Sequence, residues 1–94
     1  MYYFILNVGE YDDRDPVFMS SDLEKFKQYV KSYIEAWYAN GCKYDLIPND
    51  IIVMRENHHY EHWGVKSFYN IEHIDNVEKF NKLFEDIKDY VEEK

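Results

Sequence analysis

The chain has 94 residues, of which 46% are hydrophobic and 19% aromatic, and its formal net charge is -8. A chain of this length can bury one core but not two, so we expect a single compact domain over residues 1–94. The acidic excess argues against direct binding of nucleic acid and against an acidic membrane surface, because both require lysine and arginine to replace counterions.

The first predicted element is a strand over residues 2–8, which ends at Gly9 and is followed by a polar loop over residues 10–15. Because nearly every position of this strand is apolar, we expect it to be central and covered. A short extra strand over residues 17–19 could pair with a neighbour. The apolar start lacks the basic segment and cleavage pattern of a signal peptide, and no apolar run approaches the ~20 residues that span a bilayer.

A helix is predicted next, beginning at Asp22, because Ser21 and Glu24 have the spacing of a capping box. Asn40 and Gly41 indicate its end near Ala39. Its apolar positions recur at steps of three and four and should form a core face: Leu23, Phe26, Val30, Tyr33, Ile34 and Trp37. After the helix, Cys42 is the single cysteine, which excludes an internal disulfide and favours a reducing, cytoplasmic location.

In the second half of the chain, the residue pattern predicts a connection over residues 42–50, a strand over 51–56 and a turn over 57–59. Residues 60–74 suggest one long bulged strand or two short strands, interrupted at Gly64. A last helix should follow Asp75, which has cap spacing to Glu78. Its apolar stripe comprises Val77, Phe80, Leu83, Phe84, Ile87, Tyr90 and Val91.

Two helices that each carry one apolar stripe require one shared surface. We therefore predict an α+β fold, in which a small antiparallel sheet of three to four strands is covered on one face by two helices, in the order β-α-β-β-α. One core should unite the helical positions Leu23, Phe26, Val30, Ile34, Trp37, Phe80, Leu83, Phe84 and Ile87.

The densest polar group is the histidine cluster around His58, His59 and His62, next to Arg55 and Glu56. On a strand, His58 and His62 would lie about 13 Å apart, which is too far for one zinc ion. An enzyme acting on RNA would surround such a cluster with basic residues, whereas this acidic chain would repel RNA at a distance. We therefore expect no metal, no cofactor and no catalytic residue, although a small hydrolase or metal-dependent enzyme at His58–His62 stays an alternative.

The favoured function is that of a small acidic protein that binds, and thereby blocks, a basic partner such as a nucleic-acid-processing enzyme. The composition resembles that of inhibitors that mimic nucleic acid and of immunity proteins, and the residue usage is typical of an AT-rich bacterial or phage source. The candidate contact residues are Glu10, Tyr11, Asp12, Asp13, Asp15, Glu56, Tyr60, Glu61 and Trp63. Two alternatives stay open, namely a binder of small molecules or nucleotide derivatives with aromatic walls, and a surface whose charge serves only solubility.

Overall fold

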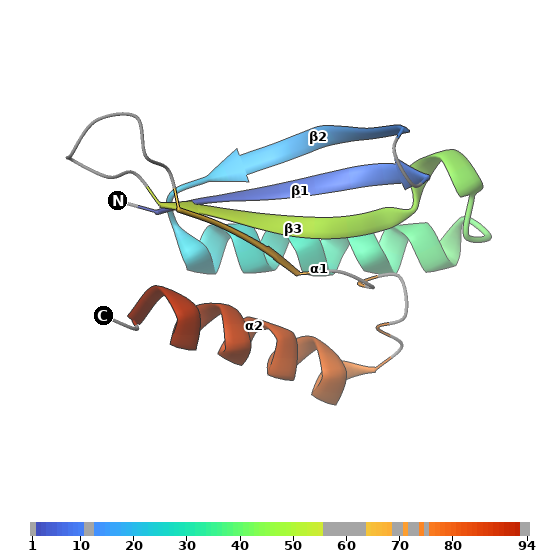
Figure 1. The fold of residues 1–94 in the computed structure, drawn as a ribbon. Helices are drawn as coiled ribbons and strands as arrows, with labels where there is room; N and C mark the ends of the chain where they lie inside the picture. Colours follow the sequence, from blue (N-terminus) through green and yellow to red (C-terminus); the bar gives the residue numbers. More distant parts are fainter. Residues whose placement is uncertain are drawn as a thin grey trace.

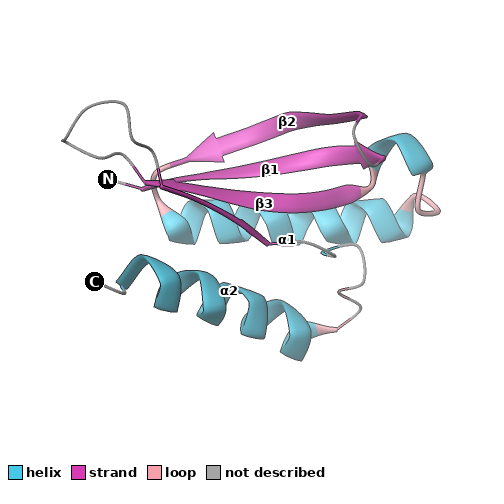
Figure 2. Ribbon diagram, viewed as in Figure 1, coloured by secondary structure: helices cyan, strands magenta, loops and turns pink. Residues whose placement is uncertain are grey.

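The computed structural model describes residues 2–10, 13–55, 64–68, 71, 74 and 76–92. Its elements are β1 (Tyr2–Glu10), β2 (Asp13–Ser20), α1 (Leu23–Ala39), the short 3-10 helix η1 (Tyr44–Leu46), β3 (Pro48–Arg55), β4 (Gly64–Phe68) and α2 (Val77–Glu92). The strands form one antiparallel sheet in the order β2-β1-β3-β4, and both helices pack against the same face of it (Figures 1 and 2). The predicted α+β class is therefore confirmed, with β2 as an added strand.

The central position predicted for the first strand is also confirmed, since β1 pairs with β2 on one side and with β3 on the other. Every second side chain of β1 and β3 is buried beneath the helices. The core comprises Phe4, Leu6, Val8, Ile51 and Val53 from these strands, Phe26, Val30 and Ile34 from α1, Phe80, Phe84 and Ile87 from α2, and Ile71. Burying each such side chain stabilises the fold by roughly 1.5–3 kcal/mol.

Phe26 joins the layers, because its ring lies 5.7 Å from that of Phe4 in the sheet and 6.2 Å from that of Phe84 in the second helix. The two helices run antiparallel to each other beneath the strands (Figure 1).

Both helices begin one residue later than predicted. The N-cap of α1 is Asp22 rather than Ser21, and the Asp22 carboxylate accepts a hydrogen bond from the Lys25 backbone N–H at 3.2 Å. At α2, the Asn76 side chain accepts from the Lys79 N–H at 2.8 Å, in place of the cap expected at Asp75. Asp and Asn accept such hydrogen bonds as well as Ser does. Because two possible capping residues stand side by side at each helix, the sequence did not decide the first residue of either helix.

The strands extend further into the polar segments than predicted. The residues expected to form a loop between the first two strands are largely paired, since Glu10 lies opposite Asp13 and Gly9 lies opposite Arg14. Likewise β3 begins at Pro48 instead of Ile51, while β4 covers only Gly64–Phe68 of the predicted segment 60–74. Backbone pairing with β1 overrides the low strand propensity of Asp and Asn in these segments.

Trp37 is the exception to the predicted core. It lies outside the core cluster, and its indole N–H donates to the Lys43 carbonyl at 2.9 Å. Tyr33, one turn earlier, donates its hydroxyl proton to the Leu46 carbonyl at 2.7 Å. These two hydrogen bonds connect the segment around η1 to α1. The last aromatic residues of the apolar stripe therefore serve as hydrogen-bond donors.

Candidate functional site

The face of the sheet opposite the helices carries a group of apolar side chains. Directly opposed residues of antiparallel strands share a face, and Ile5 lies opposite both Met19 of β2 and Ile52 of β3, while Tyr3 lies opposite Met54. None of these five side chains belongs to the core cluster or packs against it, and Met19 is 61% exposed. Tyr3, Ile5, Met19, Ile52 and Met54 are called the open face below. No described element lies over it.

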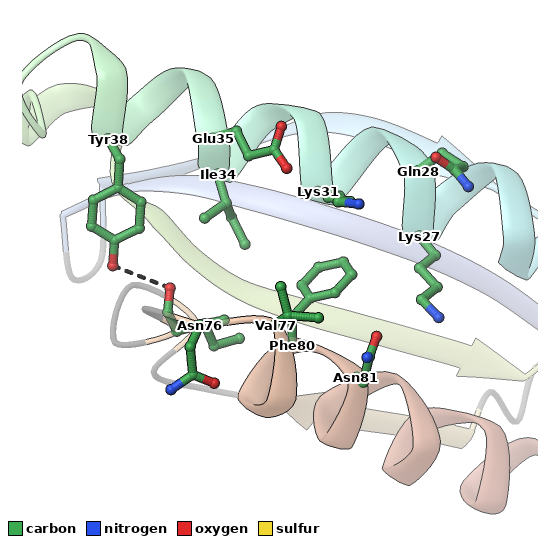
Figure 3. A pocket seen from close by; sticks show the side chains of 11 residues that line it. Lys27, Gln28, Lys31, Ile34, Glu35, Tyr38, Asn76, Val77, Phe80 and Asn81 are labelled. Atoms are coloured by element: carbon green, nitrogen blue, oxygen red, sulfur yellow. Dashed lines mark hydrogen bonds between the residues drawn. The ribbon is translucent and has the colours of Figure 1, made fainter.

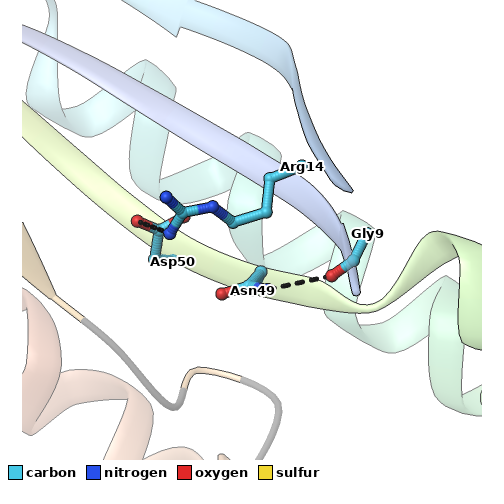
Figure 4. Close-up of polar contacts among 4 residues, drawn as sticks. All are labelled: Gly9, Arg14, Asn49 and Asp50. Atoms are coloured by element: carbon cyan, nitrogen blue, oxygen red, sulfur yellow. Dashed lines mark hydrogen bonds and ion pairs between the residues drawn. The ribbon is translucent and has the colours of Figure 1, made fainter. Parts of the chain in front are cut away.

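A buried ion pair lies at one end of the open face. Arg14 of β2 reaches across β1 to Asp50 of β3, where its Nη1 contacts Asp50 Oδ2 at 3.1 Å (Figure 4). The Asp50 side chain is 1% exposed and the Arg14 side chain 33%. Within the described part of the chain, Asp50 Oδ1 has no hydrogen-bond partner. A buried carboxylate with one oxygen unsatisfied is costly, and it depends on Arg14 for compensation.

Two irregularities in strand pairing flank this ion pair. The register between β1 and β2 shifts between Leu6 and Asn7, and the register between β1 and β3 shifts between Asn7 and Val8. Asn49 is the residue left over in β3, and its side-chain amide donates to the Gly9 carbonyl at 2.9 Å (Figure 4). Gly9 has a φ of 121°, which residues with a Cβ rarely adopt. The bulges thus shape this end of the sheet.

Three of the predicted contact residues lie within the described chain, and all three are near this end. Glu10 and Asp15 are exposed, and Asp13 lies opposite Glu10 in the sheet. Asp45 of η1 is also exposed and close by, because the Gly9 N–H donates to the carbonyl of Ile47, just after η1, at 2.8 Å. Glu10, Asp13, Asp15 and Asp45 are called the acidic end below.

The other predicted contacts, Tyr11, Asp12, Glu56, Tyr60, Glu61 and Trp63, lie outside the described residues. The last residue of β3, Arg55, pairs with Tyr2 at the start of β1, whereas the acidic end lies at the other end of β1. At about 3.3 Å per residue, the two ends of β1 lie roughly 26 Å apart. The start of β1 and the acidic end are therefore separated by the length of the sheet, with the open face between them.

The histidine cluster also lies outside the described residues, which include none of His58, His59, His62 and His73. Within the described chain, no group of three His, Cys, Asp or Glu side chains is placed to hold a metal ion. Over the same residues, neither helix has the length and apolar character needed to cross a membrane.

Two tyrosines of α1, Tyr29 and Tyr38, have structural roles. Tyr29 stacks on Phe18 with ring centroids 4.0 Å apart, and it packs against the core. Tyr38 donates its hydroxyl proton to the Ile74 carbonyl at 3.1 Å, which joins α1 to the segment before α2. Tyr29 and Tyr38 are therefore better explained by packing than by a partner.

The charges of α2 form a solvated helix face. Lys82 Nζ contacts Asp86 Oδ1 at 2.9 Å across one helical turn. Hydrogen bonding to Asp86, and then its charge, raise the pKa of Lys82 above its usual value. An exposed pair of this kind contributes little to stability, so we assign it no function.

A groove of about 470 Å³ separates α1 from the start of α2 (Figure 3). Ile34, Val77 and Phe80 supply its apolar lining, and Lys27 and Lys31 line it from α1. The groove belongs to the helical layer, whereas the open face belongs to the other side of the sheet.

Sequence reasoning missed both the open face and the groove. The signal for the open face was present, because β1 and β3 carry apolar residues on both faces, whereas an antiparallel strand with one solvated face alternates apolar and polar residues. The groove has no such signal, because it depends on how far apart two helices lie. No known family model matches the chain, and neither does any curated protein or solved structure.

Proposed function

We propose that this protein binds a basic protein partner through the open face of its sheet, with the acidic end as the rim of the contact. The observation that supports this most strongly is the apolar character of a sheet face that no described element covers. Exposed apolar patches of this kind mark interaction sites. Enzymes that act on nucleic acid have basic surfaces, and we propose that this protein blocks a partner of that class.

The arrangement resembles the usual anatomy of an interface. Apolar side chains occupy the centre of the patch, and the exposed carboxylates of Glu10, Asp15 and Asp45 lie beyond one end of it. Arg14, the base within the β1–β2 hairpin, is already paired with Asp50 and leaves the surrounding acids uncompensated. An apolar centre supplies binding energy, while rim charges steer the approach of the partner.

Charge also favours a basic partner over a second copy of the chain. Each copy carries a net charge of -8, so pairing two open faces would bring two acidic ends into one interface. Like charges placed together at an interface are costly, whereas a basic partner would gain from the same acids.

Affinity capture with matched variants tests this proposal. The immobilised protein, an open-face variant with Met19→Thr and Ile52→Thr, and a control variant with Val77→Thr would each be exposed to a bacterial lysate. Val77 is 66% exposed and lies on α2, away from the open face. We expect the wild type and the control to retain a basic protein that the open-face variant loses at least about tenfold, since buried interface anchors contribute 1–2 kcal/mol or more.

The rim is tested by the association rate of the captured partner with a Glu10→Lys/Asp15→Lys variant. We expect slower association with a weaker dependence on salt, because rim charges act mainly on encounter. Captured proteins that are acidic, or equally retained by the open-face variant, would contradict the proposal. So would a wild-type dimer in sedimentation that the open-face variant converts to a monomer, because a second copy would then cover the face.

A further inference from the structure

Two contacts between the elements that form the groove lie along its length. At one end, the rings of Phe26 and Phe84 lie 6.2 Å apart. At the other end, the Tyr38 hydroxyl donates to the Ile74 carbonyl (Figure 3). The space between these contacts is held open by the fold itself, which is typical of sites that accept small molecules.

Among the described residues, those that line the α2 side of the groove are uncharged. Half of the 16 residues of this helix are charged, yet Asn76, Val77, Phe80 and Asn81 are the residues that this part of the chain turns toward the groove. Val77 is 66% exposed, so its side chain offers apolar surface to an occupant. The acids of α2 therefore lie elsewhere on the helix.

The α1 side of the groove carries positive charge. Lys27 reaches toward Asn81, and Lys31 lies one turn further along the helix (Figure 3). Among the described residues, neither lysine forms an ion pair. Glu35 is the one acid among the described lining residues, and its carboxylate points away from Phe80 and Val77 in the same view. A chain of net charge -8 thus places two lysines, which form no ion pair within its described part, beside a groove with an apolar floor.

We propose that this groove binds a small organic monoanion with an aromatic body, which would rest on Ile34, Val77 and Phe80 while its anionic group contacts Lys27 and Lys31. The volume of about 470 Å³ lies within the range of sites that take such molecules. A single negative charge suits two lysines, whereas a polyanion would be repelled by the acidic chain. This site is independent of the proposed partner surface, because it lies in the helical layer.

The probe for this site is 8-anilinonaphthalene-1-sulfonate, an aromatic monoanion whose fluorescence rises in apolar surroundings. The full chain would be titrated beside a Lys27→Gln/Lys31→Gln variant and two controls. Lys25→Gln removes a lysine of the same helix that does not line the groove, and Ile52→Thr alters the open face. We expect saturable binding that is about fivefold weaker in the double variant and unchanged in both controls.

A neutral analogue, N-phenyl-1-naphthylamine, separates charge from apolar contact. We expect the two lysine substitutions to leave the affinity for this neutral analogue unchanged. The amide chemical shifts of Ile34 and Phe80 should change on addition of either probe. The proposal is overturned if binding of the anion does not saturate or if Ile52→Thr weakens that binding. It is also overturned if the lysine substitutions weaken the binding of both probes equally. Val77→Asp provides a second variant, since a carboxylate at this exposed position should expel the anion more than the neutral analogue.

Discussion

The two faces of the sheet are built from similar residues but have different surroundings. In β3, Ile51 and Val53 are completely buried beneath the helices, while their neighbours Ile52 and Met54 are partly exposed on the open face. In β1, the same contrast separates Leu6 from Ile5. The two faces therefore do not differ in residue type. They differ because the helices cover only one of them.

The difference between the two faces shows which apolar side chains the fold itself buries. Two helices with one apolar stripe each can cover a single face of a four-stranded sheet, and they cover the face that carries Phe4, Leu6 and Val8. The apolar residues of the other face add nothing to the core, and we propose above that a partner covers them. Substitutions on the two faces should consequently have opposite effects on stability and on binding.

The largest effect is expected from Phe84→Ala on the covered side. Phe84 is 4% exposed, and its ring lies near those of Phe26 and Phe80. Removing it leaves a cavity between the helices, which should lower the free energy of unfolding by roughly 3–5 kcal/mol. Urea denaturation measures this loss, with Val77→Ala as the exposed control on the same helix. A loss below about 1 kcal/mol would mean that α2 contributes little to the core.

A smaller loss of stability is expected from substitutions in β3, where two neighbouring residues allow a direct comparison of the two faces. Val53→Thr places a hydroxyl in a fully buried site and should cost about 1–3 kcal/mol, because the hydroxyl loses water without a partner. Ile52→Thr faces the open side and should cost less than about 1 kcal/mol, since water can reach the new hydroxyl. Chemical denaturation of both variants checks the difference. Equal losses would show that the open face is covered by the chain itself.

The smallest effect concerns Tyr33, at the margin of the covered side. Burial raises the pKa of Tyr33 above 10.0, and the charges of Tyr29 and then Asp45 raise it further. Below pH 10 the phenol is protonated in both the folded and the unfolded state. As the pH rises from 10 toward the folded pKa, the unfolded state loses its proton first, so the free energy of unfolding should fall.

Measuring the free energy of unfolding at pH 9 to 11 in the wild type and in Tyr33→Phe isolates this contribution. The variant should lose less stability over that range than the wild type. Asp45→Asn should lower the pKa of Tyr33, because it removes one of the nearby negative charges. An identical alkaline slope in Tyr33→Phe would show that Tyr33 has no part in the loss.

Local patterns predicted the helices well and their neighbours less well. The apolar steps of three and four placed both helices, and Phe26, Val30, Phe80 and Phe84 are buried as expected. Trp37 follows the same step but leaves the core for a hydrogen bond to the carbonyl of Lys43, because the sheet beneath it has ended and η1 takes its place. Periodicity identifies the face of a helix, but it does not show how far the opposing surface extends.

The sequence by itself determined both helices, the fold class and the central position of β1, because these depend on local periodicity, on caps and on the need to bury two helical stripes. Only the tertiary structure decided three further features: the pairing of Arg14 with Asp50 across β1, the apolar face left open, and the groove between α1 and α2. Each of these depends on distances between segments far apart in the chain, and such distances follow from the packing of whole layers rather than from neighbouring residues.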